Sequence, residues 1–251
     1  MRLQGAWVNC LRPDPEAPWR LWCLPFAGGG ASAFAAWPAP LAGIAEVAAI
    51  RPAGRENRLL ERPHSHWRPA VEEILAAAAP HLNRRYALLG YSLGALLAFE
   101  FARLARARGL PGPGALVILG ARAPGLPRRE PDLRALPDEA FLTELDCRYG
   151  GVPPAVRAEP ELLALLLPVM RADLTVFETY VYEPGPPLDC AVLALGGDAD
   201  PNVDASEVAA WRAHTNGPFE SALLPGGHFF AQTGLPAVAT RVAQFMLRIA
   251  I

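Results

Sequence analysis

The sequence predicts an α/β fold in which helices cover both faces of a mostly parallel sheet. Short apolar runs alternate along the chain with longer amphipathic stretches, which is the pattern of repeated strand–helix–strand units. The short runs are apolar almost throughout, rather than at every second residue. This is typical of strands that are buried on both faces of a sheet.

The alternation gives the order of the strands and helices. The strands are WRLWCLPF (19–26), VAAI (47–50), YALLG (86–90), ALVILG (115–120), CAVLALGG (190–197) and FESALLPGG (219–227). The helices are the amphipathic or apolar stretches 67–82, 95–108, 203–215 and 236–249. We expect all of them to form a single domain that covers residues 1–251.

Residues 121–188 break this rhythm. The segment begins with ARAPGLPRREPDLRALP and ends with YEPGPPL, and both stretches are rich in proline. Between them, 138–151 and 160–180 have the pattern of helices, and no strand is indicated. A helical insertion between two sheet strands, with proline-rich hinges, predicts a lid over a site at the sheet edge. The alternative is a helical decoration that only packs against the sheet.

Composition narrows the class of protein. Of the 251 residues, 52% are hydrophobic and 19% are charged, which excludes wholesale disorder. A net charge of −2 without a basic block excludes a nucleic-acid surface. The sequence has neither a signal-peptide core nor an apolar run of ~18 residues, so we expect a cytoplasmic protein with no membrane contact. The scattered Cys10, Cys23, Cys147 and Cys190 indicate free thiols or small buried hydrophobes.

The stretch Gly90-Tyr91-Ser92-Leu93-Gly94 matches G-x-S-x-G, the nucleophile elbow. In an elbow the serine occupies a strained turn between a strand and a helix, and the glycines leave room for that helix to pass close to neighbouring strands. The context fits, because a strand precedes the serine and a helical pattern follows. The N–H of Leu93 would then lie at a helix N-terminus, where a developing oxyanion is stabilised. The alternative is a serine in an ordinary tight turn.

A serine hydroxyl needs a general base, and His228 is the candidate. It follows a strand and two glycines, in LPGGHFF. His64 and His66 precede the serine and lack a third metal ligand, so we expect no metal site there. His81 and His214 fall at helix ends, where surface or capping roles are usual.

The imidazole in turn needs a carboxylate that fixes its tautomer. Asp198 and Asp200 both follow a strand, in LALGGDADPNV. We favour Asp200, because the earlier aspartate is better placed to shape the turn that leaves the strand. One helix and one strand then connect the acid to His228. This connection, and the order serine, aspartate, histidine, are those of the α/β-hydrolase fold.

A second oxyanion donor is indicated in CLPFAGGGASAF, after the first strong strand. The backbone N–H of Ala27, next to Gly28, could point at the carbonyl beside Ser92. A phosphate-binding loop is excluded, since neither glycine-rich phosphate motif is present. The alternative is a flexible loop without a catalytic part.

Taken together, these residues make the chain resemble the type II thioesterases that serve non-ribosomal peptide and polyketide synthetases, and a siderophore cluster is one such setting. The likeness covers nearly the whole chain. One departure is Tyr91, where family members usually have histidine. The matching segments are LPFAGGGAS (24–32), RPAGRENRLLE (51–61), GYSLGA (90–95), ALPDEAFLTEL (135–145), LLPVMRADLTVFETYVY (166–182), GGDADPNV (196–203) and PGGHFF (225–230).

The resemblance implies a hydrolase that removes wrong or stalled acyl or aminoacyl groups from the phosphopantetheine arm of carrier domains. Ser92 would attack the thioester, His228 and Asp200 would assist it, and the N–H groups of Ala27 and Leu93 would hold the oxyanion. No metal or redox cofactor is needed. The resemblance also implies transient binding to carrier domains by a monomer, with Arg128 and Arg129 as candidates for contacting acidic carrier surfaces.

Two other functions compete with this one. A general serine carboxylesterase would use the same three residues, because they do not separate a thioester from an oxoester. A non-catalytic carrier-binding protein could use the same scaffold. The presence of competent residues at all three triad positions argues against the second alternative.

Overall fold

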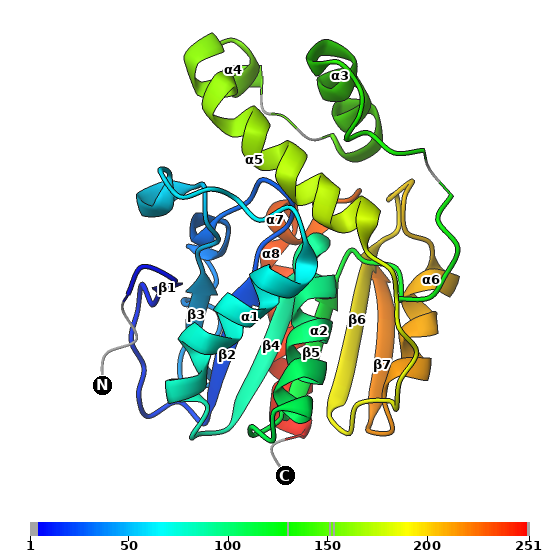
Figure 1. Ribbon diagram of the computed structural model, residues 1–251. Helices are drawn as coiled ribbons and strands as arrows, with labels where there is room; N and C mark the ends of the chain where they lie inside the picture. The colour runs from blue at the N-terminus through cyan, green and yellow to red at the C-terminus, as the bar shows by residue number, and fades with distance from the viewer. Residues whose placement is uncertain (1–4, 130, 151, 153, 250–251) are drawn as a thin grey trace.

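A computed structural model describes residues 5–129, 131–150, 152 and 154–249, and in it a seven-stranded sheet forms the centre of the molecule (Figure 1). The strand order is β1-β3-β2-β4-β5-β6-β7. The sheet is parallel except for β1, which pairs antiparallel with β3. The strands are β1 (Val8–Asn9), β2 (Trp19–Leu24), β3 (Ala45–Ile50), β4 (Tyr86–Tyr91), β5 (Ala115–Leu119), β6 (Ala191–Gly197) and β7 (Phe219–Leu224).

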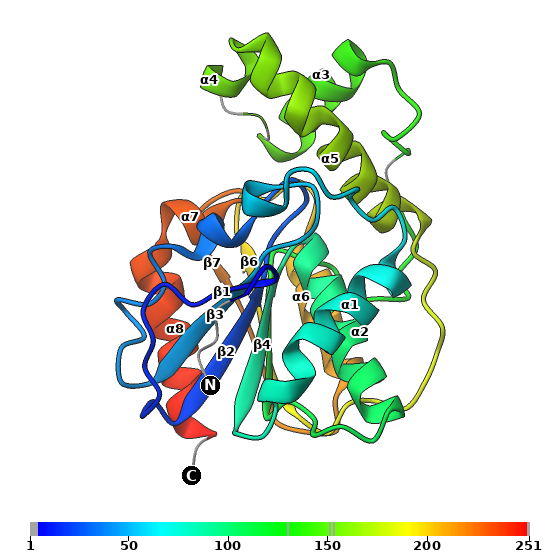
Figure 2. The ribbon, with the colours of Figure 1, turned by 60° about the vertical axis from the view of Figure 1, so that its left-hand side comes forward.

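Helices cover both faces of this sheet (Figure 2). One face carries α1 (Trp67–Ala78), α2 (Leu93–Ala107) and α6 (Ala205–Ala209). The other face carries α8 (Leu235–Arg248). Shorter helical turns join these elements: η1 (Ala31–Phe34), η2 (Glu56–Arg58), η3 (Ala79–His81), η4 (Ala210–His214) and α7 (Phe230–Thr233).

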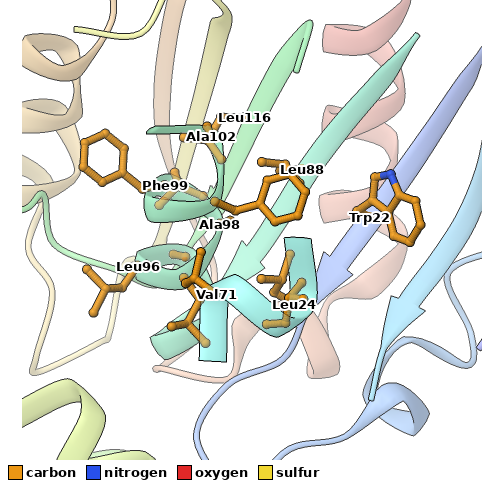
Figure 3. Packing of buried hydrophobic residues seen from close by; sticks show 14 of the residues in the cluster. Trp22, Leu24, Val71, Leu88, Leu96, Ala98, Phe99, Ala102 and Leu116 are labelled. Carbon is orange, nitrogen blue, oxygen red and sulfur yellow. The ribbon is translucent and has the colours of Figure 1, made fainter. Parts of the chain in front are cut away.

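Side chains that alternate along the strands fill two separate cores. Trp22 and Leu24 of β2 pack toward α1 and α2, together with Leu88 of β4 and Phe99 of α2 (Figure 3). Leu21, between Trp22 and Arg20 in the sequence, packs toward α8 instead. Every residue of β2, β3, β4, β5 and β6 is buried, because both faces are covered. This double burial explains why the strands lack an apolar–polar alternation.

The predicted α/β fold is confirmed, and all six predicted strands are present with boundaries within three residues. The two-residue β1 was missed, because so short a strand has no detectable periodicity. The predicted helix 67–82 ends earlier as α1 and continues as the 3₁₀ turn η3, which contains Pro80. The predicted helix 203–215 likewise divides into α6 and η4.

The helices of the segment 121–188 lie over the carboxyl ends of the strands, and its last residues run down beside α2 to the start of β6 (Figures 1 and 2). It contains α3 (Asp138–Tyr149), α4 (Pro154–Arg157) and α5 (Pro160–Thr179). The first and third of these correspond to the two helices predicted there. Leu133, Phe141 and Leu174 belong to a small core of this segment's own. None of the helices in the described ranges is long and apolar enough to cross a membrane.

The two glycines that flank Ser92 let α2 pass against the sheet. A Cβ atom on Gly90 would lie 2.2 Å from the carbonyl oxygen of Gly94. One on Gly94 would lie 2.1 Å from the carbonyl oxygen of Leu24, at the end of β2. Both neighbours are backbone atoms, which cannot move aside as a flexible side chain can. The helix that follows Ser92 therefore starts where it does only because neither position has a side chain.

We expect Gly94→Ala to lower the free energy of unfolding by about 3 kcal/mol or more, because the added methyl overlaps backbone. Chemical denaturation followed by circular dichroism measures this. Gly112→Ala is the matched control, since nothing lies within 4 Å of the Cβ it would add. Equal stabilities of the two variants would contradict the close approach of α2 to β2.

Candidate active site

Ser92 occupies the turn between β4 and α2 in a conformation that side chains rarely adopt. Its φ is 53° and its ψ is −116°. Such a residue stores about 1–3 kcal/mol of strain, which the surrounding structure must offset. Part of that support is the bond from the Ser92 N–H to the carbonyl of Leu119, at 2.8 Å. The strained turn directs the hydroxyl away from the helix and into a cavity above the sheet edge.

His228 lies beside this hydroxyl, on the loop that leaves β7. Its Nε2 is 3.0 Å from Ser92 Oγ, and its Nδ1 is 2.8 Å from Asp200 Oδ2. A carboxylate only accepts hydrogen bonds, so Nδ1 carries the proton and Nε2 of the neutral ring can accept one from Ser92. His228 is only 6% exposed. In this arrangement its imidazole ring can accept the proton of the Ser92 hydroxyl.

Of the two candidate acids, only Asp200 reaches His228. Its side chain is fully buried, and its other oxygen, Oδ1, accepts the N–H of Asn202 at 2.9 Å. Asp198 instead accepts the N–H of Gly226 at 3.0 Å and holds the turn after β7. The structure therefore brings Ser92, His228 and Asp200 together and gives Asp198 a structural contact.

Tyr91 supports the histidine from below, a role that the sequence did not indicate. Its hydroxyl donates to the backbone carbonyl of His228 at 2.7 Å, and the N–H of Ala231 donates to that hydroxyl at 3.4 Å. Burial raises the pKa of Tyr91, so the hydroxyl stays protonated and remains a donor. A phenol on an otherwise apolar buried strand was the available signal, because buried tyrosine hydroxyls usually find a partner.

The glycine loop, residues 25–30, approaches Ser92 from the end of β2. Two of its N–H groups are engaged: that of Gly29 bonds to the Phe26 carbonyl at 2.9 Å, and that of Gly28 bonds to Asp173 Oδ2 at 2.7 Å. Neither bond uses the N–H of Ala27, the sequence-predicted oxyanion donor. The other predicted donor, Leu93, is the first residue of α2, where an N–H has no acceptor within the helix.

A cavity of about 420 Å³ lies between these residues and the helices above the sheet. Ser92 and His228 belong to its wall, and Met170 and Phe177 of α5 form part of its roof. Tyr149, at the end of α3, lies with its ring centre 5.0 Å from that of His228. The segment 121–188 thus encloses the space into which the serine projects.

Arg128 and Arg129 have partners within the chain. Arg128 pairs with Asp132 at 2.6 Å and donates to the Glu178 carbonyl at 2.9 Å. Arg129 pairs with Asp204 at 2.8 Å. These ion pairs hold the two side chains at the surface, and a role for them in binding an outside partner stays a prediction.

The remaining histidines lie away from Ser92. His66 accepts the N–H of Arg68 and caps α1, and His64 pairs with Glu73 at 3.1 Å. His214 is buried rather than exposed, with Nε2 3.0 Å from the Pro124 carbonyl. Over the described ranges, no three histidine, cysteine or acidic side chains come together in a way that could hold a metal ion.

Comparison with known proteins identifies a family that this chain matches. Residues 19–246 match the family model described as thioesterase domain. The gramicidin S biosynthesis protein GrsT of Aneurinibacillus migulanus is 39% identical over 224 residues, which cover 89% of this chain and 87% of GrsT. RedJ, the thioesterase of the prodiginine pathway of Streptomyces coelicolor, superimposes with a TM-score of 0.87 at 38% identity, covering 94% of each chain. YbtT, a type II thioesterase from the yersiniabactin pathway, has a TM-score of 0.87 at 30% identity, covering 98% of this chain and 100% of YbtT.

Proposed function

The chain belongs to the thioesterase-domain family, as a type II thioesterase of the kind found in non-ribosomal peptide and polyketide pathways, and we propose that Ser92, His228 and Asp200 carry its reaction. The observation that carries the proposal is the continuous contact from Ser92 Oγ through the His228 ring to Asp200, at 3.0 and 2.8 Å. It lies at the wall of a covered cavity large enough for an acyl chain.

In the first step, Ser92 Oγ attacks the thioester carbonyl while its proton moves to His228 Nε2. The N–H groups of Ala27 and Leu93 stabilise the negative oxygen of the tetrahedral intermediate. The carbon–sulfur bond then breaks, and the thiolate takes the proton from His228. Thiols ionise near pKa ~8.5, so the sulfur leaves readily without help from a metal ion.

In the second step, a water molecule replaces the thiol beside His228. The histidine accepts one proton from the water as its oxygen attacks the acyl-serine carbonyl. Collapse of the second intermediate breaks the ester bond, and the proton returns to Ser92 Oγ. Asp200 holds the imidazole in the required tautomer and stabilises its charged form throughout both steps. The chemistry calls for no redox group.

We expect a definite ranking of variants at these positions. Ser92→Ala should fold normally and lower kcat by ~10⁶, as loss of a triad nucleophile commonly does. Asp200→Asn should lower kcat by ~10⁴, because the amide favours the wrong tautomer of His228. Asp198→Asn, the matched control, should lower it far less. Steady-state hydrolysis of an acyl thioester measures all three.

Two results would contradict this assignment. If the Ser92→Ala variant kept a tenth of wild-type activity, Ser92 would not be the nucleophile. A reversed ranking of the two aspartates would make Asp198 the acid. Comparing the matched oxoester with the thioester also decides between this enzyme and a general serine carboxylesterase, since the latter should prefer neither. Labelling of Ser92 by a fluorophosphonate excludes the non-catalytic alternative.

We further propose that the acyl group arrives on the phosphopantetheine arm of a carrier domain. Three of the cavity residues lie at an exposed rim: Gly125, Arg128 and Val181, the last of them 74% exposed. All three belong to the segment 121–188, which in this proposal acts as a lid with an opening at the rim. A long, thin arm can pass such an opening while the carrier stays outside. The contact with the carrier should be transient and below ~1,200 Å², as is usual for brief encounters of a monomer with many partners.

A carrier-bound acyl group should therefore be hydrolysed with a higher kcat/KM than the same acyl group on N-acetylcysteamine. Val181→Asp should lower kcat/KM about fivefold or more for the carrier substrate, because it replaces an exposed apolar side chain of the rim by a charged one. The free thioester should be much less affected. Leu11→Asp is the control, since Leu11 is 52% exposed and does not line the cavity.

Equal kcat/KM values for the two substrates in the wild-type protein would contradict the carrier proposal and favour the general esterase.

A cytoplasmic location is supported by Cys10, Cys23, Cys147 and Cys190. All four are free thiols, the state that a reducing compartment maintains.

The cavity wall favours acyl chains without a charged amine. Among the described residues that line it there is no carboxylate, and the charged side chains of Arg122 and Arg128 are cations. Its inner part is apolar, with Leu96, Leu174 and Trp211. The ammonium group of an aminoacyl thioester would find no counter-ion here, and burying it unpaired costs free energy. We therefore propose neutral acyl groups, rather than free aminoacyl groups, as the preferred substrates.

The matched pair for this prediction is the 4-methylpentanoyl and leucyl thioesters of N-acetylcysteamine, which differ only in the amino group. We expect kcat/KM to be about tenfold or more higher for the 4-methylpentanoyl compound. Each value is divided by the rate of hydroxide-catalysed hydrolysis of the same compound, because the amino group also activates the carbonyl. Equal or reversed values would show that the site accommodates an ammonium group.

A further inference from the structure

A buried carboxylate joins the helix that covers the cavity to the loop beside the nucleophile. Asp173 lies on α5 and is only 7% exposed. Its Oδ2 accepts the N–H of Gly28 at 2.7 Å and is 2.6 Å from Nη2 of Arg55, which is itself 5% exposed. Three segments far apart in the sequence therefore meet at one oxygen atom.

The Arg55 contact fixes where that oxygen lies. A buried guanidinium–carboxylate pair holds its geometry closely, because separating the two charges in a dry environment is costly. Arg55 comes from the loop between β3 and η2, which lies outside the segment 121–188. Asp173 is thus held against the body of the molecule while it accepts the N–H of Gly28.

The bond to Gly28 sets the orientation of the peptide that joins Ala27 to Gly28. The preceding peptide, which carries the Ala27 N–H, is held in the same turn by the bond from the Gly29 N–H to the Phe26 carbonyl at 2.9 Å. Gly28 has a φ of +77°, a conformation available to glycine at low cost, and two more glycines follow it. A loop of this composition has other backbone conformations within reach. The acceptor on α5 selects one of them, and Met170, also on α5, packs against Gly28 from above.

We propose that Asp173 is a positioning residue: by fixing the Ala27–Gly28 peptide, it keeps the turn from Phe26 to Gly29 in the conformation that directs the Ala27 N–H toward the carbonyl beside Ser92. This inference rests on the proposed function, since it assumes that Ala27 is an oxyanion donor. Asp173 touches neither the substrate nor the reacting atoms. Because Asp173 lies on α5, the oxyanion site is complete only when α5 contacts the glycine loop. Displacement of this helix then leaves Ser92, His228 and Asp200 in place and removes one donor.

The test separates the acceptor from the ion pair. The double variant Arg55→Met/Asp173→Leu replaces the buried pair by apolar residues of similar size, which often leaves stability nearly unchanged. It leaves the Gly28 N–H without its acceptor. Arg55→Met/Asp173→Asn is also uncharged but keeps a side-chain oxygen for that N–H. The matched control is Glu178→Gln, a buried α5 carboxylate that accepts the N–H groups of Leu133 and Arg134, away from the glycine loop.

We expect the leucine variant to lower kcat about 10- to 100-fold, with KM for an acyl N-acetylcysteamine thioester within about twofold of wild type. Its affinity for an alkylboronic acid, which forms a tetrahedral adduct with the serine, should fall by the same factor as kcat/KM. The asparagine variant should recover most of both losses. Glu178→Gln should change the melting temperature without changing kcat or boronate affinity.

Wild-type kcat and boronate affinity in a folded leucine variant would overturn the proposal. So would equal losses in the leucine and asparagine variants, because the charge pair would then be the important feature. If the leucine variant does not fold, Arg55→Gln/Asp173→Ala replaces it, with the same losses expected. Failure of the proposed function is distinct: wild-type protein would then not bind the boronate, and Ser92→Ala would retain activity.

Discussion

The close approach of α2 to the ends of β2 and β4 is the constraint on which the rest of this structure depends. Because Gly90 and Gly94 have no side chains, the helix starts directly beside the strands. The chain must then turn sharply at Ser92, whose positive φ is the result. That turn projects the hydroxyl beyond the sheet edge and directs the first N–H groups of α2 at the same space. The Ser92 hydroxyl and the Leu93 N–H, which are the proposed nucleophile and one proposed oxyanion donor, thus come from a single backbone feature.

The other proposed catalytic groups come from loops that leave neighbouring strands, and the segment 121–188 contacts these loops at two points. On one side, Asn202 binds both Asp200 and the backbone carbonyl of Arg148, which lies on α3. On the other side, Asp173 of α5 binds the glycine loop. The segment 121–188 therefore both encloses the cavity and contacts the site, since α3 and α5 each bond to a loop that carries part of the site.

Burial strengthens the contacts around Asp200 and His228. The carboxylate of Asp200 has no exposed surface, so its charge is satisfied by the His228 ring and the amide of Asn202. Tyr91 holds the backbone of the same histidine from inside the core. A site of low dielectric constant strengthens each of these interactions and makes a misplaced group costly.

The sequence alone determined the α/β fold, the strand order along the chain and the candidates Ser92, His228 and Asp200, because those features lie in local patterns: apolar runs, glycine spacing and the residues that follow each strand. Asp200 was preferred to Asp198 on turn geometry, but only the fold shows which carboxylate reaches the imidazole. The contacts of Tyr91, Arg129 and Asp173 could not be predicted from the sequence. Each joins segments 75 to 145 residues apart, and no local pattern records which distant group a side chain will meet once the chain has folded.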